Sequence, residues 1–310
     1  NADFDGDQMW LIALLTKDAQ DEAIELMSPK CDIINPKSGD IILAHSQDIS
    51  LGIYCSTMLK DNTLDPKDYL SSDVMQDVLF YDNVDSLRSD VYGRVIHAYN
   101  LVCLDLNNKK FLSTAGRILF NSLVPGGLSG DREYSNVLGL DVNAERFADL
   151  QYDGLITSGS PSSKTSSYKL SKICMSIYEE SLQDPSIDLL KVYGAISEFG
   201  FTMAELFGVS ISLDDLKDIT RKSGKKELLE KAEGLKSQYE RDYQRGLLVM
   251  EDKVTSVHNV YDDTLATVQD HVFGNESKGI IGSMSRNNNI FIMFDSGARG
   301  SKGQIMQTVG

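Results

Sequence analysis

The sequence predicts a mixed α/β fold, and three observations lead to this prediction. The apolar run WLIALL, at residues 10–15, is typical of a buried strand. From residue 187 to residue 273, apolar side chains recur mostly at helical spacing. The chain has 310 residues, of which 41% are hydrophobic, so it is long enough for about two domains. No apolar run approaches the roughly 20 residues that a membrane-spanning helix needs.

The first sixty residues are expected to alternate between strands and helices. A loop and the WLIALL strand occupy residues 1–15, and TKDAQDEAIELM, at residues 16–27, predicts a short helix. Pro36 and Gly39 in NPKSGD indicate a turn, after which IILA is expected to form a strand. The segment SQDISLGIYCSTMLK predicts a helix with Ser46 as its N-cap, because its apolar residues repeat at helical spacing.

Two amphipathic segments near the C-terminal end predict an antiparallel helical hairpin over residues 226–272. KKELLEKAEGLKSQYERDY carries one apolar stripe, EDKVTSVHNVYDDTLATVQDHV carries another, and Gly246 lies between them. Each helix would be about 30 Å long. Between the two ends of the chain, residues 61–90 are acidic and poorly patterned, and SGSPSSKTSS at residues 158–167 is the clearest change in composition.

Three aspartates, Asp3, Asp5 and Asp7, lie within five residues at the start of the chain, in NADFDGDQM. Carboxylates this close repel one another, so a solvated acidic loop competes with a cation site. A helix-loop-helix calcium site is excluded, because Gln8 and Leu14 stand where that loop needs glycine and a bidentate glutamate.

A magnesium site requires the backbone at these aspartates to bend. In a flat strand the outer two carboxylates would lie about 13 Å apart, too far for one ion. Gly6 can adopt positive φ and is where the bend is expected. The WLIALL strand would then fix this loop to a core.

Charge and cysteine content exclude other classes of protein. A net charge of −16 argues against a chain that grips a nucleic-acid backbone by itself, although partner subunits can supply basic surface. The four cysteines form no CxxC pair, which excludes a zinc ribbon and favours free thiols. The four histidines form no ligand-spaced pair.

Several blocks of the sequence resemble one family in order. NADFDGDQM resembles the active-site loop of the largest, β′-type subunit of multisubunit DNA-directed RNA polymerases. NPKSGDIILAHSQDISLGIY, STAGRILFNSLVPGGL and FGFTMAELFGVSISLDDL resemble blocks that follow it. NNNIFIMFDSGARGSKGQIMQTVG resembles the block just before the bridge helix. The resemblance implies a diverged middle fragment of that subunit, and we expect a split subunit of a giant-bacteriophage RNA polymerase.

The resemblance implies Mg²⁺-dependent nucleotidyl transfer to the RNA 3′ end, by the assembled complex only. A catalytic and metal-binding role falls to three residues, Asp3, Asp5 and Asp7. They would hold one permanent Mg²⁺, and a second Mg²⁺ would arrive with the nucleotide. Asn1 would contact the ribose. Arg299 would face the path of the incoming triphosphate, the alternative being an arginine in a salt bridge within its loop, and Gln47 would line the same path.

The resemblance also implies a domain plan. Residues 1–58 would carry the end of a double-psi β-barrel with the metal loop, and residues 59–186 would be a connecting, mostly helical region. Residues 187–310 would form the rim of the channel through which nucleotides enter, with the hairpin and the SGARGS loop. Four apolar side chains at the hairpin tip would be open to a partner, or would pack back onto the hairpin or a neighbouring subunit: Leu247, Leu248, Val249 and Met250.

The implied partners are the β-type subunit, the remaining β′-type parts, the DNA template, nascent RNA and nucleoside triphosphates, with no membrane. The implied location is the cytoplasm, or for a viral protein the host cytoplasm or the virion. Two alternatives stay open: a structural or regulatory polymerase paralogue without the metal, and an RNA-templated polymerase with a similar barrel. The intact aspartate motif argues against the first, and the SGARGS block argues against the second.

Overall fold

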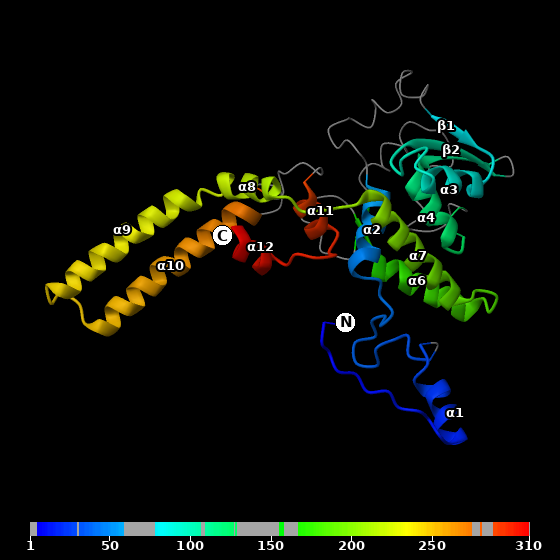
Figure 1. Cartoon of the computed structure of the whole chain (residues 1–310), viewed down its shortest axis with the longest axis horizontal. Coiled ribbons are helices and arrows are strands. Elements are labelled where there is room, and N and C mark those ends of the chain that lie inside the picture. Colours follow the sequence, from blue (N-terminus) through cyan, green and yellow to red (C-terminus); the bar gives the residue numbers. More distant parts are fainter. Residues whose placement is uncertain are drawn as a thin grey trace. The chain divides into compact units, whose positions relative to one another are not determined.

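The computed structural model describes residues 5–29, 31–58, 78–106, 109–126, 128, 155–157, 167–274, 280 and 288–309. Two compact units divide the chain, Asn1–Ala44 and His45–Gly310. Helices dominate, and a small sheet lies in the second unit (Figure 1). Among the helices in the described residues, none is long and apolar enough to cross a membrane. The chain is therefore a helix-dominated mixed α/β protein, as the sequence predicted.

Among its described residues, the first unit contains a short helix and a tight turn at NPKSGD. Helix α1 spans Lys17–Leu26, where the sequence predicted a helix. In the predicted NPKSGD turn, the amide of Gly39 donates to the carbonyl of Asn35 at 2.8 Å. The strand expected directly after this turn is reduced to an isolated bridge between Ile34 and Ile41.

The prediction of a buried strand at WLIALL is wrong. Residues 10–15 are not in a strand, and they are exposed rather than buried. The side chains of Trp10, Leu11 and Leu15 are 93%, 102% and 89% exposed. The physical reason is the lack of a partner: no strand among the described residues of this unit can pair with the segment, and an isolated extended segment cannot bury its side chains.

Two helices cross in close contact at the centre of the second unit. These are α2 (Gln47–Thr57), where the sequence predicted a helix, and α7 (Leu189–Phe207), and they lie side by side in Figure 1. The two helices touch through glycines. A side chain on Gly52 would collide with the carbonyl oxygen of Gly200, and one on Gly200 would collide with the backbone of Ile49. The close crossing buries α2 continuously from Ser50 to Thr57.

Two more helices cover this pair. Helix α4 (Ala115–Leu123) packs on α2 and α7. The ring centroids of Phe120 and Phe199 lie 6.1 Å apart between α4 and α7. Helix α6 (Leu170–Gln183) packs on α7, where the Tyr193 hydroxyl donates to the carbonyl of Cys174 at 2.7 Å. The core of the second unit is thus a helical layer around α2 and α7.

A three-stranded sheet lies beside this helical layer, in order β1-β2-β3. Its strands are β1 (Leu79–Tyr81), β2 (Leu101–Leu106) and β3 (Lys109–Thr114). Strands β1 and β2 are parallel and are connected through α3 (Val84–Tyr92), whereas β2 and β3 are antiparallel. Leu79 aligns with Val102, and Leu104 aligns with Phe111. A separate parallel pair consists of β4 (Leu155–Thr157) and β5 (Ser167–Lys169).

The C-terminal part consists of helices α8 (Leu213–Lys222), α9 (Lys225–Gln244), α10 (Met250–Phe273), α11 (Asn289–Asp295) and α12 (Lys302–Val309). Helices α9 and α10 run side by side from a short turn (Figure 1). The Tyr261 hydroxyl donates to Glu233 Oε1 at 2.6 Å between them. At the other end of the pair, Val272 packs with Ile219, Phe291 and Met306 in one apolar cluster, which joins α10 to α8, α11 and α12.

Candidate functional site

The predicted magnesium loop is described only in part. Asn1 and Asp3 lie outside the described residues, while Asp5 and Asp7 are described and exposed. Gly6, between them, has a φ of 131°, so the bend that the sequence predicted at this glycine is present. Carboxylate oxygens are the ligands that Mg²⁺ prefers, so the donor chemistry fits the ion. Within the described part of the chain, no cluster of three or more potential metal-binding side chains occurs, and with Asp3 outside it the three-aspartate set is not tested.

Gln47 is the first residue of α2 and is exposed. Its φ of 52° lies in the left-handed region, which is unfavourable for a residue with a side chain. Ser46 is the N-cap, as predicted, but its side chain makes no capping hydrogen bond. A strained residue at the start of a buried helix is maintained only when its surroundings fix it, and such strain is concentrated at functional sites.

The SGARGS loop, residues 296–301, follows directly after α11. Its buried and exposed residues alternate: Ser296 and Ala298 are buried, while Gly297 and Arg299 are exposed. Gly297 and Gly300 have φ values of 70° and 91°, which glycine adopts without strain. The burial of alternate residues turns Arg299 outward.

Hydrogen bonds close the SGARGS loop onto the preceding helix. The amide of Arg299 donates to the carbonyl of Met293 at 3.3 Å, and the Ser296 hydroxyl donates to the same carbonyl at 3.1 Å. None of the ion pairs among the described residues involves the Arg299 side chain. The alternative of an arginine in a salt bridge within its loop therefore finds no partner among the described residues.

A buried hydrogen bond that the sequence did not reveal joins α2 to α11. The Tyr54 hydroxyl donates to Asp295 Oδ2 at 2.7 Å, although the two residues are 241 positions apart. Tyr54 is 0% exposed and Asp295 is 2% exposed. The available signal was weak: a tyrosine inside a predicted helix, and an aspartate directly before SGARGS. Each is also common in proteins without such a contact.

A second buried polar cluster connects the segment just before α2 with α6 and α7. His45 Nε2 lies 3.0 Å from the carbonyl oxygen of Tyr193, and Cys174 Sγ lies 3.5 Å from His45 Nδ1. Since a carbonyl only accepts, Nε2 carries the proton and Nδ1 is left to accept from the thiol. Burial lowers the pKa of His45 and raises the pKa of Cys174 to about 12, so both groups are neutral at pH 7. This cluster stabilises packing and lacks a reactive thiolate.

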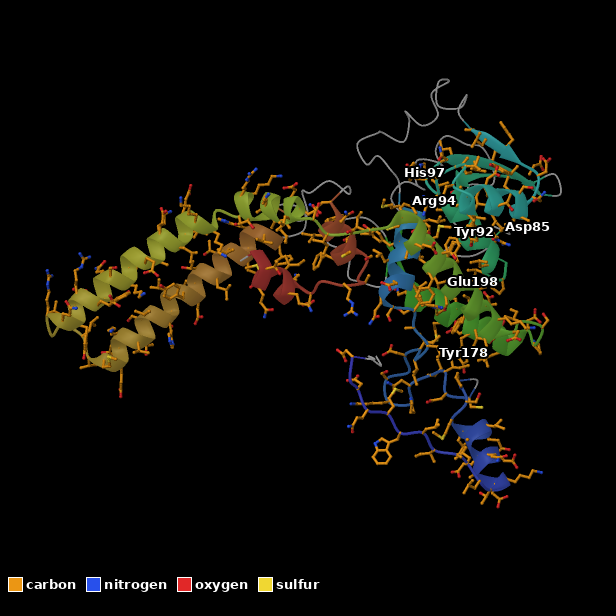
Figure 2. All side chains as sticks on the ribbon, in the orientation of Figure 1. Asp85, Tyr92, Arg94, His97, Tyr178 and Glu198 are labelled. Carbon is orange, nitrogen blue, oxygen red and sulfur yellow. The ribbon has the colours of Figure 1, made fainter. Side chains whose placement is uncertain are left out.

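A small pocket opens between α3 and α7. Its apolar wall includes Val91, Met203 and Phe207, and Arg94 and His97 lie at it in the segment after α3 (Figure 2). Its volume is about 90 Å³. Sites for drug-sized ligands typically measure roughly 300–1,000 Å³, so this pocket is too small for a nucleoside triphosphate. It is therefore not the nucleotide site.

Comparisons with known proteins agree over the whole chain. Residues 32–216 match the family described as RNA polymerase Rpb1, domain 3, and residues 241–310 match RNA polymerase Rpb1, domain 4. The chain is 30% identical over 315 residues to the DNA-directed RNA polymerase subunit beta' of Clostridioides difficile, which covers 100% of the chain and 23% of that subunit. The subunit beta' of Borreliella afzelii is 31% identical over 314 residues, covering 100% of the chain and 19% of that subunit.

The chain thus spans about a fifth to a quarter of the length of these relatives. The first family match alone, over residues 32–216, covers more than half of the chain, and it includes both α2 and α7. The second match includes the SGARGS loop. The chain therefore belongs to the family of the largest RNA polymerase subunit, in the part of that subunit that comprises Rpb1 domains 3 and 4.

Proposed function

We propose that this chain is the catalytic segment of a multisubunit DNA-directed RNA polymerase, and that Asp3, Asp5 and Asp7 hold its magnesium ion. The observation that carries the proposal is the bend at Gly6, with a φ of 131°, inside the motif NADFDGDQM of a chain of this family. When bound, Mg²⁺ would stabilise the negative charge that develops during phosphoryl transfer.

The exposed WLIALL segment fits this proposal if its partner strands come from other parts of the polymerase. Trp10 and Leu11 are almost fully exposed in the first unit, and contiguous exposed apolar side chains are unusual on the surface of a monomeric protein. The relatives contain three quarters or more of their length beyond the matched part. We propose that those parts complete a double-psi β-barrel around residues 1–58 and bury this segment.

Three residues are proposed to bind the incoming nucleotide: Asn1, Gln47 and Arg299. The outward Arg299, without a described carboxylate partner, provides a positive charge for the triphosphate. The strained, exposed Gln47 provides an amide next to the start of a buried helix. Activity should require the β-type subunit, the remaining β′-type parts, DNA and RNA, because the chain has a net charge of −16 and cannot hold nucleic acid alone.

Helices α9 and α10 are proposed to form the hairpin at the rim of the nucleotide channel. Their mutual contacts, including the Tyr261–Glu233 hydrogen bond, allow the pair to project without a large interface elsewhere. At the turn between them, Leu247 and Val249 are 70% and 63% exposed, whereas Leu248 is half-buried. This exposure favours a tip that is open to a partner over one that packs back onto the hairpin.

The experiment that tests the proposal is Asp5→Ala in the assembled polymerase. Extension of an RNA primer on a template should fall by about 10³-fold or more, because the metal would lose a ligand. Asp21→Ala is the matched control, since Asp21 is an exposed aspartate on α1 of the same unit. It should leave extension unchanged. Near-normal Mg²⁺-dependent extension by the Asp5→Ala enzyme would show that the chain is a structural or regulatory subunit instead.

A further inference from the structure

The hydrogen bond between Tyr54 and Asp295 lies at a structurally important place. Tyr54 is in the second half of α2, and Asp295 is the last residue of α11, directly before the SGARGS loop. Both side chains are buried, and the hydroxyl and the carboxylate oxygen are 2.7 Å apart. A hydrogen bond that is buried away from water is strong, and it restricts the positions of the donor and the acceptor. The end of α11 is therefore fixed against α2.

The contact between α2 and α11 also holds the SGARGS loop in place. Ala298, in the middle of the loop, packs in one apolar cluster with Leu51, Tyr54 and Ile292. Arg299 is the next residue, and its amide is bonded to Met293 of α11. The backbone that leads into Arg299 is thus tied to α2 through Ala298 and to α11 through the Arg299 amide. A change in the α2–α11 contact would move Arg299 before it moved more distant parts of the unit.

Helix α2 also carries Gln47 at its other end. Tyr54 lies seven positions after Gln47, which corresponds to about 10 Å along a helix. The helix is buried from Ser50 to Thr57, so it transmits position as a rigid body. One assembly of α2, α11 and the SGARGS loop therefore carries both described residues that are proposed to bind the nucleotide.

We infer that Tyr54 and Asp295 are positioning residues for the nucleotide, acting by fixing Arg299 and Gln47 in one rigid arrangement. The inference rests on the proposed function, because it takes Arg299 and Gln47 as nucleotide-binding groups. Neither Tyr54 nor Asp295 touches the nucleotide, since both side chains are buried. Loss of their hydrogen bond should therefore weaken nucleotide binding more than it slows the chemical step.

The test measures KM and kcat for nucleoside triphosphates, using the assembled polymerase on a primed scaffold. Tyr54→Phe keeps the ring in its cluster and removes only the hydroxyl, and Asp295→Leu removes the acceptor from the other side. We expect either change to raise KM about three- to tenfold with kcat within about twofold of normal, as for an interaction used in binding. Asp295→Asn keeps an oxygen acceptor for the Tyr54 hydroxyl and should raise KM less.

The matched control is Tyr81→Phe, which removes another tyrosine–aspartate hydrogen bond of the second unit. The Tyr81 hydroxyl donates to Asp90 Oδ2 at 2.6 Å, between β1 and α3 rather than between α2 and α11. The Tyr81→Phe substitution should lower the thermal stability of the chain without changing the KM for nucleoside triphosphates. An unchanged KM in Tyr54→Phe, or an equal rise in Tyr81→Phe, would overturn the inference. If neither Tyr54→Phe nor Asp295→Leu assembles, the pair serves folding and the inference is likewise overturned.

Asp5→Ala, measured on the same scaffold, separates this inference from the proposed function. If Asp5→Ala abolishes extension and Tyr54→Phe leaves KM unchanged, the inference fails while the proposed function stands. If Asp5→Ala extends normally, the proposed function itself fails.

Discussion

Two loops are proposed to meet the substrate, and they are held in opposite ways. The aspartate loop, around Gly6, is followed by an apolar segment that is exposed from Trp10 to Leu15. The SGARGS loop, in contrast, follows a buried hydrogen bond and contains the buried Ala298. The geometry of the SGARGS loop is thus determined within its own unit. Under the proposed function, the aspartate loop would obtain its fixed position from the other parts of the polymerase.

The largest expected effect comes from breaking the core beneath the SGARGS loop. Gly200→Ala places a methyl group against the backbone of Ile49 and should lower the free energy of unfolding by about 3 kcal/mol or more. Gly194→Ala, in the same helix, has open space at the new methyl group and should raise it by about 0.5–1 kcal/mol. Urea denaturation of the chain measures both. A similar effect of the two substitutions would show that α2 and α7 do not cross in close contact.

A pair of leucines compares the two regions directly. Leu51→Ala empties part of the cluster under the SGARGS loop and should cost about 2–3 kcal/mol of unfolding free energy. Leu11 is 102% exposed, so Leu11→Ala should change that free energy by less than about 0.5 kcal/mol in the isolated chain. In the assembled polymerase the second substitution should become costly, because Leu11 would then be buried. Equal costs in the isolated chain would contradict the difference between the two loops.

The contribution of histidines to the pH dependence of stability should come from the second unit, because the first unit contains none of the four histidines. Burial holds the pKa of His45 below its ordinary value of 6.5. The unfolded chain therefore binds a proton more readily, and stability falls as pH drops below 6.5, by up to about 1.4 kcal/mol per pH unit. Denaturation at pH 7.5 and at pH 5.5 measures this slope, which His45→Asn should reduce. An unchanged slope in the variant would assign the acid sensitivity to carboxylates.

Local patterns in the sequence were sufficient for several of the helices and for the bend at Gly6. Apolar repeats predicted α1, α2 and the two segments that became α9 and α10, because a helix satisfies its own backbone hydrogen bonds. Gly6 was expected to bend because only a residue without a side chain adopts a φ of 131° without strain. These features depend on neighbours in sequence.

Features that depend on distant partners were not predictable in this way. The three-stranded sheet was missed because β1 has only three residues and pairs with β2 across α3. The composition of residues 10–15 predicts a buried strand, but burial requires a partner strand, which their own unit lacks among the described residues. The Tyr54–Asp295 contact spans 241 positions, and no local pattern specifies it.

The distribution of the four thiols has a practical consequence. Cys55, Cys103 and Cys174 are buried, and Cys31, in the first unit, is exposed. Burial raises the pKa of Cys55 and of Cys174 to about 12, so little reactive thiolate forms there at neutral pH. A maleimide dye would therefore attach at Cys31 in preference to the buried thiols. The native chain thus offers an attachment site for a fluorescent dye on the unit that holds the aspartates, without any engineered cysteine. A change in the fluorescence of that dye would report the burial of this unit by partner subunits.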